Sequence, residues 1–493
     1  MFFTMTTAKN LIGGQWSAPE NLAFGDVFNP SQGQIIARVP MSGQSEVDAA
    51  VQAARKAFES WGQTPASKRS AILFRYRELL EANFEAIARI VTLENGKTWE
   101  EAKGDVRRGI EVVELACGIG QLAKGESLPQ VADGIDAATM REPLGVCAGI
   151  TPFNFPAMVP MWMFPLAIAC GNTFILKPSE KVPLTAIKLA EIFQEAGLPD
   201  GVFNIVQGGR EVVDALCTHV GISAVSFVGS SNVARHVYTL GTSHGKRVQA
   251  AGGAKNVLLV MPDADADSSL RAIMGSSYGC AGQRCMAGSI LMTVGAKTGD
   301  AYRDLVSESL SKMTVGDTIE NAQAEMGPVI DGAAQSRIKK MVEAAPSHGA
   351  TVAFQGENVP SEGFFVAPTL LDNVSPQMDA FGSEIFGPVL SMVRQNTLDE
   401  AIATMNGLAF GNGATIFTSS GGAARQFARE MQCGMIGVNI GVPAPMALFS
   451  FSGWNDSFYG DLHVQGNEGV LFYTRQKVVL SRWDKSYVRQ MGW

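Results

Sequence analysis

The feature that most restricts the fold is an uncharged run between Pro143 and Leu176. An apolar run of this length is long enough to span a membrane, but the five prolines and two asparagines within it argue against one spanning helix. The run instead predicts a buried strand at 146–150, a buried helix around 161–170 and a second buried strand at 173–177. A strand, a helix and a strand in this order form a βαβ unit, so the sequence predicts a parallel sheet.

Helices and strands continue to alternate on both sides of this unit. Residues 46–125 have the apolar spacing of helices, and 125–141 is expected to hold extended strands with a turn at Gly134. Further along, the expected helices are 184–196, 209–218 and 233–240, and the expected strands are 202–206, 224–228, 247–251 and 257–260. These segments predict a doubly wound α/β domain, whose ligands bind beyond the carboxyl ends of the strands.

A second alternating region begins after Asp263 and runs to about residue 450. Its expected strands are 289–294, 365–370, 389–394, 414–417 and 435–438. The tail at 469–483 is expected to be a closing strand, with 470–473 and 478–480 as its apolar parts. Because 493 residues exceed one ordinary hydrophobic core, two or three domains are expected.

The composition excludes several classes of function. A net charge of −8 and a pI near 5.4 argue against nucleic acid and anionic membranes as partners. The seven cysteines form no CxxC pair, which is typical of free thiols in a reducing compartment. None of the five histidines belongs to an HExxH array, so no protein-held metal is expected. The first ten residues lack the basic and apolar regions of a signal peptide, so a cytoplasmic protein is expected.

Two expected strand ends carry groups that can bind a dinucleotide, although no GxGxxG motif occurs. Lys177 ends one expected strand and Glu180 follows it, and both can reach ribose hydroxyls, whereas the Ser230 hydroxyl follows another strand and can meet a phosphate. Each signal is weak alone, but the two together at one edge of one sheet favour a dinucleotide site.

The segment from Gly279 to Ala287 holds the candidate nucleophile, Cys285. Small neighbours leave room beside this cysteine, and Arg284 precedes it directly. A nearby cation favours the thiolate, which is the reactive form of a cysteine. Cys285 is also compatible with a small residue that fills a core, and Cys280 is expected to be such a residue. The segment alone therefore leaves both interpretations of Cys285 open.

Five motifs, found in order along nearly the whole chain, resemble those of the aldehyde dehydrogenase superfamily. They are Thr151-Pro152-Phe153-Asn154-Phe155-Pro156, Lys177-Pro178-Ser179-Glu180, Phe227-Val228-Gly229-Ser230, Gly282-Gln283-Arg284-Cys285-Met286-Ala287 and Glu384-Ile385-Phe386-Gly387-Pro388-Val389. Within the superfamily, the chain looks most like the CoA-acylating methylmalonate-semialdehyde dehydrogenases. This likeness to one branch rests on Arg247-Val248-Gln249-Ala250, Gly253-Ala254-Lys255-Asn256 and Phe449-Ser450-Phe451-Ser452-Gly453.

The resemblance implies a role for each matching residue. Cys285 would add to an aldehyde, and Asn154 would form the oxyanion hole together with the backbone N–H of Cys285. Arg108 and Arg284 would bind a substrate carboxylate, a task that suits the planar guanidinium group. Arg108 also lies nearer the apolar side of its expected helix than Arg107 does.

The resemblance also implies an NAD site. Its residues would be Thr151, Phe153, Lys177, Glu180, Lys181 and Ser230, with Glu384 on the nicotinamide ribose. A carboxylate at Glu180 beside the ribose hydroxyls would repel a 2′-phosphate, so NAD is favoured over NADP.

One segment departs from the hydrolytic members of the superfamily. Where these have Glu-Leu-Gly-Gly-Lys, this chain has Ala251-Gly252-Gly253-Ala254-Lys255, and no Asp or Glu lies between Asp214 and Asp263. Because hydrolysis would lack its general base there, we expect the CoA thiol to cleave the enzyme thioester. After loss of CO₂, methylmalonate semialdehyde would give propanoyl-CoA and malonate semialdehyde would give acetyl-CoA. One methyl group is worth only ~1–3 kcal/mol of discrimination, so the choice between them stays open.

Two other interpretations stay open: a hydrolytic NAD-dependent aldehyde dehydrogenase, and a non-catalytic protein that kept the fold. Under the resemblance, residues 1–122 and 142–253 would bind NAD, 254–469 would carry catalysis, and 123–141 with 470–493 would form an oligomerisation arm. Because strands that extend from a body need a partner's edge, a homodimer or homotetramer is expected.

Overall fold

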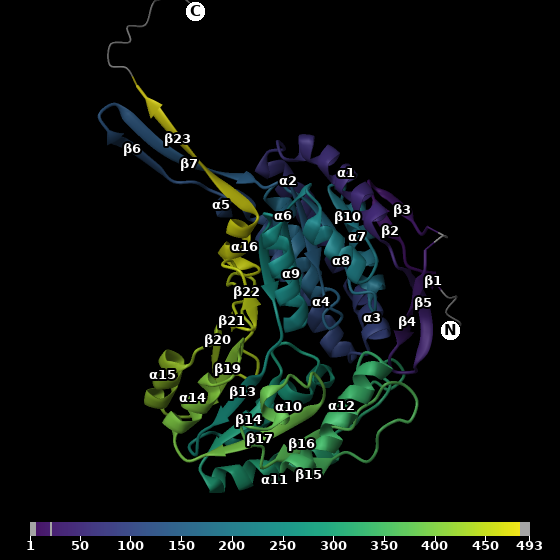
Figure 1. The fold of residues 1–493 in the computed structure, drawn as a ribbon, viewed down its shortest axis with the longest axis vertical. Coiled ribbons are helices and arrows are strands. Elements are labelled where there is room, and N and C mark those ends of the chain that lie inside the picture. Colours follow the sequence, from purple (N-terminus) through teal and green to yellow (C-terminus); the bar gives the residue numbers. More distant parts are fainter. Residues whose placement is uncertain (1–5, 20–21, 484–493) are drawn as a thin grey trace, which may run out of the picture.

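The computed structural model describes residues 6–19 and 22–483, which form two lobes and a projecting arm (Figure 1). The fold is α/β, as the sequence predicts, and each lobe is built around a largely parallel sheet. Among the described residues, no helix is both long and apolar enough to cross a membrane. In the same part of the chain, no group of three His, Cys, Asp or Glu side chains could hold a metal ion.

The uncharged run forms the predicted βαβ unit. The strands β8 (Val146–Ile150) and β9 (Thr173–Lys177) pair in parallel and have the predicted bounds. The helix α6 (Met158–Ala169) connects them and begins three residues earlier than expected. Every residue of these three elements is buried, which explains why the run carries no charge.

The first lobe contains an eight-stranded sheet of order β22-β12-β11-β8-β9-β10-β2-β3. The strands from β12 to β10 are parallel, and antiparallel strands close both edges. Alternate residues of β8 face two separate hydrophobic clusters, so helices cover both sides of the sheet. The other strands are β2 (Asn10–Ile12), β3 (Gln15–Ser17), β10 (Phe203–Ile205), β11 (Ile222–Val228), β12 (Arg247–Ala251) and β22 (Phe458–Tyr459). The helices are α1 (Gln44–Trp61), α2 (Ala66–Ala82), α3 (Phe84–Asn95), α4 (Trp99–Cys117), α5 (Ile119–Leu122), α7 (Pro183–Glu195), α8 (Arg210–Thr218) and α9 (Ser231–Ser243).

The second lobe contains a seven-stranded sheet of order β15-β16-β17-β14-β13-β19-β20, in which only the edge strand β15 is antiparallel. Its strands are β13 (Asn256–Val260), β14 (Gly288–Val294), β15 (Thr351–Gln355), β16 (Thr369–Asp372), β17 (Val389–Gln395), β19 (Gly413–Phe417) and β20 (Met435–Val438). Its helices are α10 (Ala266–Tyr278), α11 (Ala296–Lys312), α12 (Gly332–Ala344), α13 (Asp379–Gly382), α14 (Leu398–Asn406) and α15 (Gly421–Glu430).

Two expectations about these strands are wrong. The strand expected at 257–260 does not continue the first sheet, because β13 pairs with β14 and β19 at the centre of the second. The strand expected at 365–370 begins only at Thr369. The residue before it is Pro368, which has no N–H to donate to a ladder.

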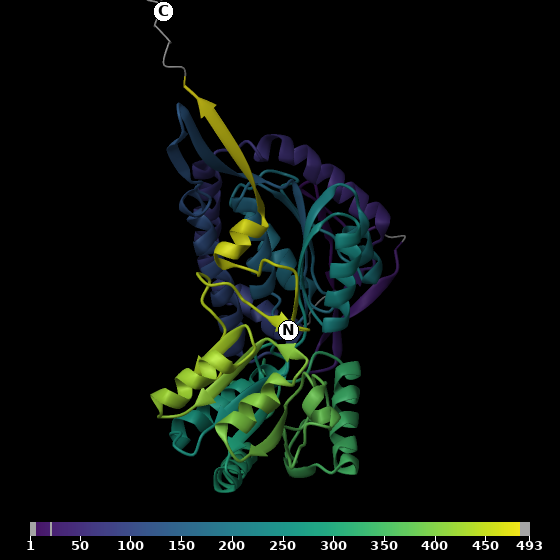
Figure 2. The ribbon, with the colours of Figure 1, turned by 60° about the vertical axis from the view of Figure 1, so that its left-hand side comes forward.

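The arm is a three-stranded sheet that projects from the first lobe (Figures 1 and 2). It consists of the hairpin β6 (Ser127–Ala132) and β7 (Ile135–Pro143), which turns at Gly134, and of β23 (Thr474–Arg482) paired along β7. The remaining short strands are β1 (Thr6–Thr7), β4 (Phe24–Asn29), β5 (Gln34–Pro40), β18 (Phe410–Gly411) and β21 (Trp454–Asn455).

The expectation of a strand at 470–473 is wrong. Most of this segment belongs to the helix α16 (Gly466–Phe472), whose buried residues pack next to α6. A short apolar run does not by itself distinguish a buried helix from a strand. Arg247 donates to the carbonyls of Leu471, Phe472 and Thr474, and so holds the end of α16 where β23 begins. Residues 484–493 of the expected arm lie outside the described residues.

Candidate active site

The residues before Cys285 form a tight turn at the carboxyl end of α10. In this 3₁₀ turn, Gly279–Gly282, the backbones of Cys280 (φ 53°) and Ala281 (φ 50°) are left-handed. Such a conformation stores on the order of 1–3 kcal/mol for each non-glycine residue, so the surrounding structure must hold the turn. The N–H of Cys280 donates to the Glu101 carboxylate at 2.5 Å, which fixes the turn to the first lobe.

Gly282 brings the same turn against the segment that carries Glu384. Its φ of 68° is also left-handed, and a Cβ at this position would lie 2.1 Å from the carbonyl oxygen of Gly387. Only glycine fits such a contact. The two segments that the resemblance assigns to the nucleophile and to the nicotinamide ribose are therefore in direct contact.

Cys285 follows the turn and is partly exposed, whereas the other six cysteines are buried. Removal from water raises the pKa of the Cys285 thiol to about 12, and the negative charge of Glu384 adds to this rise. Arg284 lowers the same pKa but does not outweigh the burial. Without ligands, the thiol is therefore protonated near neutral pH.

This protonation state predicts how Cys285 reacts with iodoacetamide. Because only the thiolate is alkylated, the rate at Cys285 should rise about tenfold per pH unit from pH 7 to pH 10, without a plateau. Mass spectrometry of the peptide that contains Cys285 would measure the rate. In Glu384→Gln the rate at a fixed pH should be higher, because one cause of the raised pKa is removed. A plateau below pH 8 in the wild type would contradict the raised pKa.

Asn154 lies beside the nucleophile segment, as its expected oxyanion role requires. The residue is buried, and its Nδ2 donates to the carbonyl of Gln283 at 3.0 Å. An amide nitrogen carries two hydrogens, so one N–H stays available for a further acceptor. Two backbone groups of the same loop are held by Asn95, which donates to the Phe153 carbonyl, and by Lys97, which donates to the Asn154 carbonyl.

Cys285, Arg108 and Arg284 line one cavity of about 200 Å³. Aromatic and thioether side chains form much of its remaining wall. They belong to Phe155, Met158, Trp162, Met286 and Phe451. Met158 and Trp162 thus contribute to the cavity from α6, whereas Met161 and Met163 are core residues of the first lobe. Glu101, Asp105 and the buried thiol of Cys280 also line the cavity, and the Asp105 carboxylate is paired with Lys97. The Cys285 thiol, the two guanidinium groups and the apolar wall suit a small molecule that carries a carboxylate.

Both arginines already have partners. Arg108 donates to Glu111 at 2.9 Å and to the carbonyl of Pro445. Arg284 lies 3.2 Å from the Cys280 sulfur and 3.9 Å from the Glu101 carboxylate.

Arg107 points elsewhere. It pairs with Glu81 on the exposed side of α4, so the expectation that Arg108 rather than Arg107 points inward is confirmed.

Three of the expected cofactor residues meet at the carboxyl edge of the first sheet. The N–H of Thr151 donates to the carbonyl of Lys177 at 3.1 Å, and Lys177 pairs with Glu180 at 2.9 Å. Burial opposes the ionisation of Glu180, but the charge and the hydrogen bond of Lys177 outweigh it and lower the pKa of this carboxyl. Glu180 is therefore an anionic hydrogen-bond acceptor at neutral pH.

Two further cofactor residues lie around this edge. Ser230 is the N-cap residue of α9, but its hydroxyl makes no capping hydrogen bond. The first N–H groups of this helix therefore do not donate to the Ser230 side chain. Lys181 pairs with Asp331 at 2.6 Å and lies 5.2 Å from the centre of the Phe153 ring. A free helix N-terminus at a strand end suits a phosphate group.

Glu384 lies between the two sheets, where its carboxylate accepts a hydrogen bond from the N–H of Ala254 at 3.0 Å. Burial raises the pKa of Glu384 to about 7. Burial also lowers the pKa of neighbouring Lys255 to about 7, and the Nζ of Lys255 has no hydrogen-bond partner within the described part of the chain.

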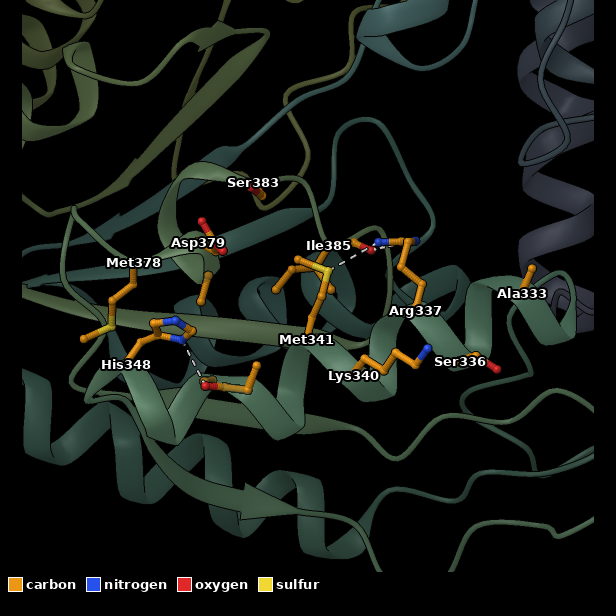
Figure 3. Close-up of a pocket in the computed structure, with 13 residues that line it drawn as sticks. Ala333, Ser336, Arg337, Lys340, Met341, His348, Met378, Asp379, Ser383 and Ile385 are labelled. Carbon is orange, nitrogen blue, oxygen red and sulfur yellow. Dashed lines mark hydrogen bonds between the residues drawn. The ribbon is translucent and has the colours of Figure 1, made fainter.

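A second cavity, of about 480 Å³, lies between α12 and residues 378–385 (Figure 3). None of the predicted site residues lines it. In Figure 3 the Arg337 side chain extends from α12 to the carbonyl of Ile385, to which it donates at 2.7 Å. This bond fixes the residue that follows Glu384.

The sequence reasoning missed Lys97, Glu101 and Asp105, all of which contact the candidate site. One signal was present: Glu101, Asp105 and Arg108 recur at helical spacing along α4, so they share one face. Nothing in the local sequence indicates that this face meets the segments of Asn154 and Cys285.

Comparisons with known proteins agree with this geometry. A model of the aldehyde dehydrogenase family matches residues 16–479. Malonate-semialdehyde dehydrogenase of Halalkalibacterium halodurans is 49% identical over 477 residues, which cover 96% of this chain and 98% of the relative. The crystal structure of methylmalonate-semialdehyde dehydrogenase from Oceanimonas doudoroffii has a TM-score of 0.96 at 44% identity and covers 98% of this chain and 99% of its own. A Sinorhizobium meliloti 1021 structure in complex with NAD, described as a methylmalonate-semialdehyde dehydrogenase, has the same TM-score and coverage at 41% identity. This chain therefore belongs to the aldehyde dehydrogenase family.

Proposed function

We propose that this enzyme oxidises malonate semialdehyde and methylmalonate semialdehyde with NAD, and transfers the acyl group to CoA with loss of CO₂. The observation that carries the proposal is the cavity that Cys285 shares with Arg108 and Arg284. A semialdehyde of this kind has an aldehyde for the thiol and a carboxylate for the guanidinium groups. The names of the relatives from Halalkalibacterium and Oceanimonas support the same substrate class.

The residues of the chain can carry out the first half of the reaction. The Cys285 thiol gives up its proton to solvent, its sulfur forms a bond to the aldehyde carbon, and the carbonyl electron pair moves to the oxygen. The resulting alkoxide accepts hydrogen bonds from the Asn154 amide and the backbone N–H of Cys285. Bound NAD would supply the acceptor for the hydride of this carbon. A thioester on Cys285 is then left for the second half of the reaction.

The residues around the sheet edge fit a dinucleotide. Glu180 and Glu384 supply carboxylates for ribose hydroxyls, and the free N-terminus of α9 supplies N–H donors for a phosphate. The anionic Glu180 favours NAD over NADP, because a 2′-phosphate would meet a negative charge.

In the second half of the reaction, the site favours CoA over water as the acceptor of the acyl group. Ala251 lies at the end of β12, buried in the cluster against which Cys285 packs, and offers no base. The nearby carboxylates of Glu101, Asp105 and Glu384 each accept a backbone N–H bond. We infer that the CoA thiol attacks the thioester carbonyl, the bond to Cys285 breaks, and the Cys285 thiolate leaves. The carboxylate is lost as CO₂, and the electron pair passes to an enolate that takes a proton.

NADH absorbance with malonate semialdehyde, measured with and without CoA, tests this proposal. Steady NADH formation is expected only with CoA, and a single burst of about one equivalent per site is expected without it. The matched substrate is propanal, which lacks the carboxylate and should be oxidised far less efficiently. Steady turnover without CoA would show that water cleaves the thioester, and would establish the hydrolytic alternative.

Arg108→Ala should raise KM for malonate semialdehyde by about 10- to 100-fold, because a hydrogen bond to a charged group is worth about 1.5–3 kcal/mol. The KM for propanal should change little. Arg107→Ala is the matched control, since Arg107 is the neighbouring residue and points to solvent. An equal effect of Arg108→Ala on both aldehydes would contradict the carboxylate-binding role.

The division of the chain follows the same proposal. Residues 1–122 and 142–253 would bind NAD, 254–469 would carry catalysis, and 123–141 with 470–493 would form an oligomerisation arm. The support is that β6, β7 and β23 leave the first lobe as a ribbon in which β6 and most of β23 are exposed, with Val478 and Leu480 on its surface. A second copy of the chain would cover these side chains, in a homodimer or homotetramer. The seven free cysteines suit the reducing cytoplasm.

A further inference from the structure

Helix α4 presents Glu101, Asp105 and Arg108 along one face, at intervals of four and three residues. All three residues line the cavity of Cys285, and two of them also hold backbone groups nearby. Arg108 lines the cavity beside Cys285, and Glu101 accepts the N–H of Cys280. Asp105 accepts the N–H of Met158 at 2.7 Å, at the start of α6. One helix therefore contacts the substrate cavity, the nucleophile turn and the loop that precedes α6.

Asp105 acts together with Lys97, which lies between α3 and α4. The Lys97 Nζ is 2.8 Å from the Asp105 carboxylate, and the two side chains are 1% and 0% exposed. The same Nζ donates to the carbonyl of Asn154 at 2.5 Å and lies 3.6 Å from the centre of the Phe155 ring. The pair thus holds Asn154, in the loop that joins β8 to α6, and Met158, the first residue of α6.

The stability of the fold does not by itself explain this buried ion pair. Desolvation of two buried charges offsets most of their attraction, so apolar residues of similar size would stabilise a fold about as well. Each partner also bonds to one backbone group, Lys97 to the carbonyl of Asn154 and Asp105 to the N–H of Met158, so the pair fixes the second half of the loop between β8 and α6. What the pair supplies is therefore a fixed position of this loop.

We propose that Lys97 and Asp105 are positioning residues that hold the Asn154 amide at the oxyanion site. Lys97 fixes the Asn154 backbone, and the Gln283 carbonyl takes one of the two amide hydrogens. With the Asn154 backbone and the first amide hydrogen fixed, the second amide hydrogen points in a single direction. This inference rests on the proposed function, because it assumes that an alkoxide forms beside Asn154.

A double-mutant cycle between Lys97→Met and Asn154→Ala tests the proposal with malonate semialdehyde and CoA. If Lys97 acts through Asn154, Lys97→Met should lower kcat by about 10²-fold in the wild type. In the Asn154→Ala background it should lower kcat by less than about threefold. The KM should change little in both backgrounds. An equal loss of kcat in the two backgrounds would overturn the proposal.

Arg394→Met is the matched control, because Arg394 forms an ion pair with the buried carboxylate of Asp372 on the second sheet. Any fall in kcat that Arg394→Met causes should be the same in the wild-type background and in the Asn154→Ala background. Asp105→Asn is the second variant, since it keeps an acceptor for the Met158 N–H and removes only the charge. It should show the same dependence on Asn154 as Lys97→Met does.

Hydrogen exchange of the peptide that spans 153–158 gives a readout that does not depend on activity. Lys97→Met should raise its deuterium uptake, whereas Arg394→Met should not, and unchanged uptake in Lys97→Met would overturn the proposal. If the wild type oxidises propanal but not malonate semialdehyde, the substrate assignment fails. The cycle can then be measured with propanal, so the two failures are distinguishable.

Discussion

Replacing Cys285 with alanine is expected to abolish NADH formation, with a fall in kcat of at least about 10⁴-fold, as for removal of other catalytic nucleophiles. The other thiol that lines the cavity, Cys280, is buried, accepts a hydrogen bond from Arg284 and has a pKa raised by burial, so it is not expected to replace Cys285. NAD should still bind, since the expected cofactor residues lie on the sheet edge and at Glu384. Stopped-flow absorbance at 340 nm would measure the first turnover, and quenching of protein fluorescence would measure NAD binding.

Cys433→Ala is the control for this experiment, because it removes a buried thiol from the core of the second lobe. It should retain most of the activity. Turnover of Cys285→Ala close to that of the wild type would contradict the nucleophile assignment. Loss of NAD binding in the same variant would instead indicate a damaged site.

Replacing Asn154 with alanine should lower kcat by about 10²–10³-fold, the usual cost of one donor in an oxyanion hole. The KM should change less, because the donor acts on charge that develops after the substrate is bound. Asn154→Asp is the sharper variant. It keeps the size of the side chain but places a carboxylate where the alkoxide forms, so its activity should be lower still. A fall in kcat of less than about threefold in Asn154→Ala would show that Asn154 is not a donor of the oxyanion hole.

The strands that the sequence predicts best are short, apolar and bounded by turn residues. Strands β8, β9, β12 and β20 have the predicted bounds, and a glycine or an asparagine lies directly beside one end of each. Strand β13 has nearly the predicted bounds but belongs to the other sheet. Periodicity describes a strand and not its neighbours, so the pairing of β13 with β14 and β19 was not predictable in this way.

The sequence predicted the candidate site residues that belong to a recognisable motif. Arg284 and Cys285 are adjacent in the sequence, whereas Arg108 comes from the distant helix α4, and the structure places all three around one cavity. The contacts of Lys97 and Asp105 with the site were not predictable, because they are made to backbone groups of Asn154 and Met158, which no side-chain pattern reveals. The raised pKa of Cys285 also depends on burial, which outweighs the adjacent arginine.

The contact between Gly282 and Gly387 has a consequence for the order of events during turnover. The two backbones meet without a side chain between them, and Arg337 anchors the segment of Glu384 to α12. Because of this contact, a shift of the turn before Cys285 would displace the segment of Glu384, and the reverse also holds. Under the proposed function, in which Glu384 binds the nicotinamide ribose, relaxation of that segment when the reduced dinucleotide leaves would reach the thioester directly. Departure of the first product and exposure of the acyl group to an incoming thiol would thus be linked as parts of one mechanical movement.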